Sequence, residues 1–121
     1  MTTTQAAAIR IKRAYVEADP ADGIRVLVDR LWPRGLSKER AHLDEWFKDI
    51  APSPGLRRWF DHDPALLQEF SRRYRAELHN NPAAVAHMQE LAAQGPLTLV
   101  YAARDPRCNH AQVLADYLIN L

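Results

Sequence analysis

Two groups of charged and polar side chains stand out, because each follows a run of residues typical of a β-strand. Residues 29–35 read Asp-Arg-Leu-Trp-Pro-Arg-Gly after the strand-like run 24–28, and residues 104–110 read Arg-Asp-Pro-Arg-Cys-Asn-His after the strand-like run 97–102. Arginine binds carboxylates and phosphates through paired hydrogen bonds, and histidine gains or loses a proton near neutral pH. Together the two groups have the residue types of an anion-binding site with one candidate acid–base residue.

The position of both groups after strand-like runs predicts a shared site. In an open α/β sheet, ligands bind in the crevice beyond the carboxyl ends of the strands. We therefore predict that 24–28 and 97–102 form parallel strands of one sheet, with their carboxyl ends at the same edge. The side chains that follow the two strands would then line one crevice.

In this crevice we expect a small anionic ligand, such as a phosphate ester or a nucleotide. Charge would come from Arg30, Arg34 and Arg104, and hydrogen bonds from Ser37 and Asn109. His110 would be the catalytic proton donor or acceptor if the site carries out a reaction. The remaining candidate ligand-binding residues are Trp32, Tyr101 and Asp105.

Structural roles remain open for several of these residues. The arginines can instead pair with Asp29 or Asp49, and Trp32 can fill the core. Asn109 with Gln112 three residues later has the pattern of a capping box at a helix start. Cys108 is expected to be an ordinary, unreactive cysteine. The nearby base in the sequence is His110, and residues so close in sequence seldom align for proton transfer.

Four pairs of a capping residue and a proline mark the predicted helix starts. They are Ser53-Pro54, Asp63-Pro64, Asn81-Pro82 and Asp105-Pro106, and they place helix starts at 54, 64, 82 and about 106. Residues 9–15 alternate between apolar and charged side chains, which predicts a half-exposed strand. Residues 43–50 fit either a strand or a helix, and we favour a strand. This order predicts a single small α/β domain with a short, mainly parallel sheet and flanking helices.

Composition limits the classes of protein to consider. The chain has 121 residues, which suits one domain at 9–121 after a frayed N-terminus at 1–8. One cysteine, no apolar signal segment and no run of about 18 apolar residues predict a cytoplasmic protein without membrane contact. No phosphate-binding loop or dinucleotide fingerprint is present, so no cofactor is expected. The Asp61-His62-Asp63 run has poor ligand geometry, and no metal site is predicted.

A second class of function, a regulatory module that binds nucleic acid or protein, is supported by one predicted helix. Its face carries Arg72, Arg73 and Arg75, with Trp59 and Tyr74 nearby. The formal net charge of only +1 opposes nucleic-acid binding. The sequence leaves the oligomeric state open.

Several motifs resemble the YeaO-like family, a widespread bacterial family catalogued as a domain of unknown function (number 488). The resemblance covers nearly the whole chain and is carried by Val-Asp-Arg-Leu-Trp-Pro-Arg-Gly at 28–35, Ile-Ala-Pro-Ser at 50–53, His-Asp-Pro at 62–64 and Tyr-Ala-Ala-Arg-Asp-Pro at 101–106. It implies a compact α/β fold with a Rossmann-like sheet, and it implies no particular reaction. A wider set of relatives is similar but has Cys-His-Arg where this chain has Asn-His-Ala at 109–111. His110 therefore matches the histidine of these relatives, whereas their cysteine position holds Asn109 in this chain.

Overall fold

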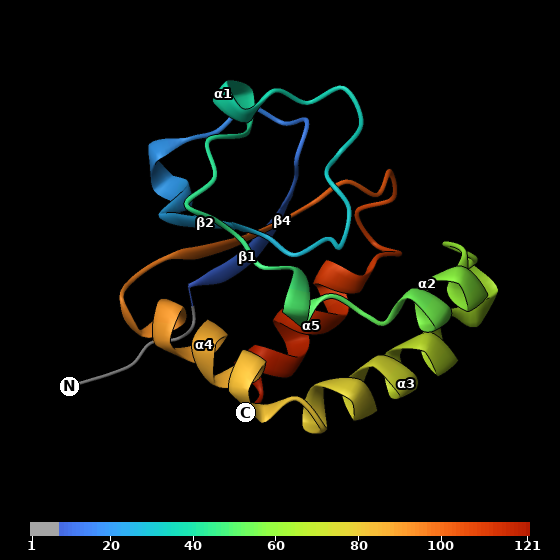
Figure 1. Cartoon of the computed structure of the whole chain (residues 1–121). Helices are drawn as coiled ribbons and strands as arrows, with labels where there is room; N and C mark the ends of the chain where they lie inside the picture. Colours follow the sequence, from blue (N-terminus) through green and yellow to red (C-terminus); the bar gives the residue numbers. More distant parts are fainter. Residues whose placement is uncertain (1–7) are drawn as a thin grey trace.

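The computed structural model describes residues 8–121, which form an α/β fold around a four-stranded sheet (Figure 1). The strands are β1 (Ile9–Arg13), β2 (Ile24–Leu27), β3 (Glu45–Trp46) and β4 (Leu97–Tyr101). The sheet order is β1-β4-β2-β3, and every neighbouring pair is parallel. The predicted parallel pairing of 24–28 with 97–102 is confirmed, as is the predicted fold class of a small, Rossmann-like α/β protein.

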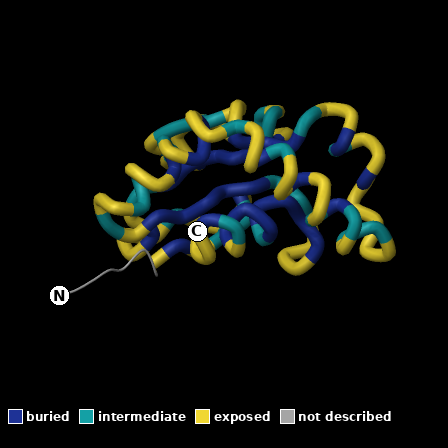
Figure 2. The backbone as a smooth tube through the Cα atoms, turned by 90° about the horizontal axis from the view of Figure 1, so that it is seen from below, coloured by how far each residue is buried: buried dark blue, intermediate teal, exposed yellow. Residues whose placement is uncertain are grey.

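The central strand β4 is buried at all five positions, as expected for a parallel sheet covered on both faces. Alternate residues of β2 and β4 enter different hydrophobic clusters. Val26 and Leu99 join the larger cluster, which includes side chains of the long helices, whereas Leu27 and Val100 join the smaller one. Figure 2 shows the buried strands enclosed between exposed turns on either side.

The helices lie on the two faces of the sheet unequally (Figure 1). The larger hydrophobic cluster contains side chains of α3, α4 and α5 and part of α2, whereas the smaller cluster includes Ala41 of the short α1. The bounds are α1 Lys38–Ala41, α2 Pro54–Phe60, α3 Leu67–His79, α4 Pro82–Ala93 and α5 His110–Ile119. Short 3-10 turns occupy Pro20–Asp22, Lys48–Ile50 and Pro64–Leu66.

Two of the four predicted helix starts need correction. Helices begin at Pro54 and Pro82 as predicted, but Pro64 opens a 3-10 turn, and α3 begins only at Leu67. Pro106 starts no helix. The Asp105 side chain accepts from the Arg107 amide in a local turn, and Asn109 provides the cap of α5.

The remaining secondary-structure predictions are met in part. Residues 43–50 contain the two-residue strand β3, followed by a 3-10 turn rather than a longer strand. The predicted strand at 9–15 is shorter, ending at Arg13. The prediction of a frayed N-terminus falls mostly on residues 1–7, which lie outside the described residues.

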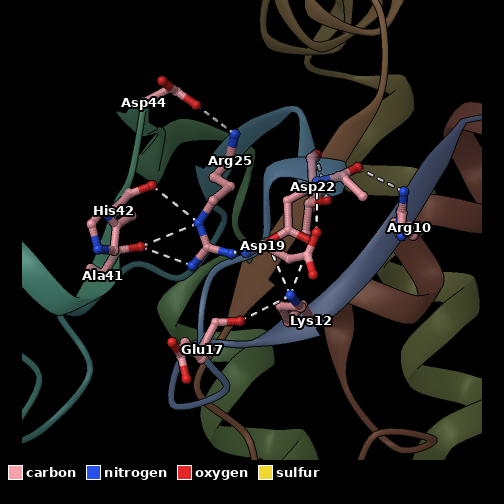
Figure 3. Close-up of polar contacts among 11 residues, drawn as sticks. Arg10, Lys12, Glu17, Asp19, Asp22, Arg25, Ala41, His42 and Asp44 are labelled. Atoms are coloured by element: carbon pink, nitrogen blue, oxygen red, sulfur yellow. Dashed lines mark hydrogen bonds and ion pairs between the residues drawn. The ribbon is translucent and has the colours of Figure 1, made fainter.

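A buried ionic cluster joins β1 to the turn that precedes β2 and to the amino end of β2 (Figure 3). Asp22 is 1% exposed and Arg25 is 4% exposed, and they pair at 2.6 Å. Lys12 approaches the same carboxylate at 3.0 Å. The Arg25 guanidinium also donates to the carbonyl oxygens of Ala41 and His42, so the cluster fixes the turn after α1 against β2.

Within residues 8–121, no helix combines the length and the apolar character needed to cross a membrane.

Candidate functional site

A cavity of about 570 Å³ lies beyond the carboxyl ends of β2 and β4, and we call it the strand-end cavity. Figure 1 shows the connections after these two strands leaving the same edge of the sheet, close to α2. Its volume is typical of sites for small ligands. The cavity is lined by Tyr15, Asp29, Arg30, Leu31, Trp32, Pro33, Arg34, Ala51, Pro52, Arg57, Phe60, His62, Phe70, Ala102, Ala103, Arg104, Asp105 and His110.

Six of the nine candidate residues from the sequence line this cavity. They come from both polar groups and are Arg30, Trp32, Arg34, Arg104, Asp105 and His110. The fold therefore brings together two segments that are about seventy residues apart in sequence, as the parallel arrangement of β2 and β4 requires.

The other three candidates have structural positions instead. Ser37 caps α1, its hydroxyl oxygen accepting from the Arg40 amide at 3.1 Å. Tyr101 is 2% exposed within the core. Asn109 is fully buried, and its side chain accepts from the Gln112 amide at 2.9 Å. None of the three residues lines the cavity. For Asn109, the alternative role as a helix cap is the one observed.

The arginines give the cavity a positive character. Four arginines and two aspartates line it, which is a net charge of +2 with the histidines neutral. The Arg30 guanidinium donates to the carbonyl oxygens of Ala51 and Pro52 at 3.2–3.4 Å, which holds it in place. The ion pairs among residues 8–121 involve none of the cavity arginines. Arg34, Arg57 and Arg104 thus keep their donors available for a ligand.

Asp29 and His110 form the polar floor. Nε2 of His110 lies 3.0 Å from the Val28 carbonyl oxygen and 3.1 Å from Oδ1 of Asp29. One N–H hydrogen cannot point well at both oxygens, and Oδ1 is buried without a satisfactory hydrogen bond. The other carboxylate oxygen, Oδ2, accepts from the Ala102 amide at 3.0 Å. Because a carbonyl can only accept, Nε2 carries the proton.

The walls of the cavity are largely apolar and held in fixed positions. The rings of Phe60 and Phe70 stack with centroids 4.0 Å apart and an interplanar angle of 15°. Trp32 donates its indole hydrogen to the Leu36 carbonyl at 2.7 Å, and Tyr15 donates its hydroxyl hydrogen to the Arg34 carbonyl at 2.7 Å. Leu31 stands at the rim with 61% of its surface exposed. Walls of this kind can pack against an apolar or planar group.

A constrained turn after α2 forms another part of the rim. Asp61 and His62 have φ values of 46° and 56°, which L-residues seldom adopt, and two such residues in succession cost backbone energy. The Cys108 thiol is directed at the His62 carbonyl oxygen, 3.7 Å away. Burial raises the pKa of this thiol, and Asp105 and Asp63 raise it further. The thiol therefore stays protonated and helps to hold the turn.

Sequence reasoning did not select several cavity residues. Asp29 stands in the first polar group, where the sequence indicates only a partner for arginine. Arg57, Phe70 and His62 come from α2, α3 and the turn between them. Helical spacing predicts that Phe70 is buried, but no local signal shows that α2 and α3 extend past the sheet edge to close the cavity. Among residues 8–121, no group of three or more His, Cys, Asp or Glu side chains is placed to hold a metal ion.

Comparisons with known proteins place these features in a family. Residues 8–121 match the family model described as "Inactive DUF488-N3 subclade". The chain is 44% identical over 110 residues to an uncharacterised protein of Mycobacterium tuberculosis, covering 91% of this chain and 92% of the relative. It is also 44% identical over 113 residues to the uncharacterised protein YeaO of Escherichia coli, covering 93% of this chain and 98% of the relative. No solved structure matches the chain.

Proposed function

Because this chain belongs to the YeaO-like DUF488 family and matches a subclade described as inactive, we propose that it binds a small anionic ligand without transforming it. The ligand occupies the strand-end cavity. The observation that supports this most directly is the presence of three arginines, Arg34, Arg57 and Arg104, around one cavity without ion-pair partners among the described residues. Guanidinium groups left available in a concave site bind phosphate or carboxylate well.

The walls support a ligand with an apolar or planar part as well as a charge. Phe60 and Phe70 give an aromatic surface, and Leu31 adds an exposed aliphatic rim. A phosphate ester or a nucleotide combines an anionic group with such a body, and either fits a volume of about 570 Å³. We propose this class of ligand, with the phosphate toward the arginines.

The sequence of the second polar group is consistent with binding rather than catalysis. The family resemblance implies that a wider set of relatives carries Cys-His-Arg where this chain has Asn109-His110-Ala111. Here Asn109 is a buried helix cap, and the Cys108 thiol has a raised pKa because of burial. We therefore propose His110 as a ligand contact rather than as a catalytic residue.

The alternative, a nucleic-acid- or protein-binding module, has weaker support. Two of the arginines on which it depends, Arg72 and Arg73, both pair with Glu69 on the same helix. This pairing reduces the positive charge of the α3 face, whereas the cavity arginines keep theirs.

A thermal-shift screen of phosphate esters and nucleotides, followed by calorimetry on the hits, tests the proposal, since ligand binding raises the unfolding temperature. Phenyl phosphate and AMP serve as first probes. Arg34→Ala and Arg104→Ala should each weaken binding about 10- to 100-fold, as expected for loss of a charge-assisted hydrogen bond.

Arg58→Ala is the matched control, because Arg58 is exposed on α2 beside Arg57 but does not line the cavity. Its affinity should equal that of the unmodified protein. Equal losses in Arg58→Ala and Arg34→Ala, or no binding of any phosphate ester, would contradict the proposed function.

A further inference from the structure

We propose that anion binding in the strand-end cavity is coupled to the uptake of one proton by His110. This inference rests on the proposed function, and it adds a regulatory property to the same site: the ligand is held more tightly as the pH falls. It is carried by the arrangement of Asp29 and His110 at the cavity floor.

The first step concerns which ring nitrogen is available. Nε2 of His110 is directed at the Val28 carbonyl and Asp29 Oδ1, at 3.0 Å and 3.1 Å. Nε2 therefore holds the ring proton in the neutral state. Nδ1 has no hydrogen-bond partner among residues 8–121, and His110 borders the cavity. A second proton would be added at Nδ1, where it could be donated to a ligand oxygen.

The second step concerns the carboxylate behind the ring. Asp29 Oδ1 is buried and has no satisfactory hydrogen bond. The nearest basic group is the His110 imidazole, whose Nε2 lies 3.1 Å away. A positive charge on the imidazole would strengthen the contact with Oδ1, because the two groups would then form an ion pair with a charge-assisted hydrogen bond. Asp29 is therefore placed to pair with a protonated His110.

The third step concerns what a bound anion changes. Four positive side chains line the cavity around His110, namely Arg30, Arg34, Arg57 and Arg104. Besides Asp29, the carboxylate that lines it is that of Asp105. A bound anion offsets the charge of these arginines and brings an opposite charge to the ring, which favours a second proton on it. Ligand and proton therefore assist each other, and the coupling is reciprocal.

The other elements packed against α5 contribute no competing proton donor at the ring. From α3, the Tyr74 ring lies edge-on at 6.3 Å, and burial, with Glu77 and Asp29, raises its pKa well above the ordinary value, so it stays neutral. From β4, burial raises the pKa of Tyr101 as well. From β1, Arg13 donates to the Ala103 carbonyl. From α4, His87 is bound to Glu45 in a separate hollow.

His62 is the one other titratable imidazole that lines the cavity. It stands at the exposed rim, and no carboxylate among residues 8–121 pairs with it. It has no buried carboxylate beside it of the kind that His110 has in Asp29, so the structure assigns the coupling to His110.

The experiment uses phenyl sulfate, an aromatic anion whose own charge is constant from about pH 5.5 to 8.5, where imidazoles titrate. Calorimetry in two buffers with different ionisation enthalpies measures the protons taken up on binding. We expect uptake approaching one proton and an affinity that rises by up to about tenfold per pH unit as the pH falls.

Variants assign the proton to a residue. His110→Gln keeps an N–H donor for Val28 but does not titrate, so its affinity for phenyl sulfate should be independent of pH. Asp29→Asn should reduce the proton uptake while Arg-dependent binding persists. His79→Gln, at the exposed end of α3 and outside the cavity, is the control that keeps the full effect. Loss of the effect in His62→Gln instead of His110→Gln would overturn the proposal.

Nitrogen NMR of the histidine rings gives a readout that needs no variant to fold well, with His110→Gln used only for assignment. The free protein should show His110 protonated at Nε2 alone, and saturating phenyl sulfate should protonate both nitrogens. Binding without proton uptake or a change at His110 overturns the coupling and leaves the proposed function intact. Failure of both phenyl sulfate and phenyl phosphate to bind at any pH overturns both.

Discussion

Oδ2 of Asp29 accepts a hydrogen bond from the backbone amide of Ala102, across 3.0 Å and 73 residues of sequence. This contact lies just beyond the last paired residues of β2 and β4, where the sheet ladder has ended. It joins the two connections that form the cavity and leaves Oδ1 facing His110. Asp29 therefore links the segments that follow β2 and β4, and it also forms part of the cavity floor.

Replacing Asp29 separates these two roles. Asp29→Ala leaves the partly buried Ala102 amide without an acceptor, and we expect a loss of about 1–3 kcal/mol in the free energy of unfolding. Asp29→Asn retains an acceptor oxygen, so its loss should be clearly smaller. Chemical denaturation measures both, and equal losses in the two variants would show that the amide contact contributes little.

Asp22 should make the protein sensitive to acid. Burial raises the pKa of this carboxyl, but hydrogen bonds from Lys12, the Asp19 amide and Arg25 outweigh burial, and the net pKa is lowered. The stabilisation is therefore complete above the ordinary value of about 3.9 and is lost as the pH falls through the lowered one.

The variant Asp22→Asn should lose about 3–5 kcal/mol, because it leaves the Arg25 guanidinium buried without its partner. Its unfolding free energy should also lose part of its dependence on acid. Asp116→Asn, on the exposed side of α5, is the control and should change stability little. Denaturation curves from about pH 2 to 7 check both expectations.

The Cys108 thiol should react slowly with alkylating reagents. It is 3% exposed, and burial together with Asp105 and Asp63 raises its pKa. Iodoacetamide labelling in the folded protein should therefore rise only at a pH above that of a free thiol, which titrates near 8.5. Unfolding in denaturant should restore the ordinary rate. A thiol that is labelled rapidly at neutral pH in the folded protein would be inconsistent with this environment.

Nucleic acid should bind weakly at about 0.15 M salt, because affinity of this kind depends on many uncompensated cations. Glu69 pairs with Arg72 and Arg73 at 2.6 Å and 2.8 Å, and these contacts hold the pKa of Glu69 at about 2, so the pairing persists at neutral pH. Fluorescence anisotropy with labelled DNA and RNA measures the affinity. Submicromolar binding that is lost in Arg72→Ala but kept in Arg34→Ala would favour the alternative function.

The strand pattern could be predicted because the relevant signals are local. The strand-like runs at 24–28 and 97–102 form buried parallel strands, and the turn residues that follow them identify the edge at which the polar groups meet. The sequence therefore indicated where the cavity lies and six of the residues that line it.

The remainder depends on contacts that a local pattern does not contain. Asp105-Pro106 has the composition of a helix start, yet the chain makes a turn there, and the buried Asn109 side chain bridges the Asp105 carbonyl and the Gln112 amide. Phe60 and Phe70 meet only because α2 and α3 pack against each other. Ser37 is expected from the sequence to bind a ligand, but its hydroxyl oxygen accepts a hydrogen bond from the Arg40 amide and caps α1 instead.

The sheet order has a consequence for how the protein is made. The strand that lies between β1 and β2 is β4, which is the last of the four to be synthesised. While the ribosome has released only the first three strands, β1 has no neighbour, and β2 has only the two-residue pairing with β3. Assembly of the sheet therefore waits for Leu97–Tyr101, and nascent chains that pause before this segment expose strand edges to chaperones and proteases.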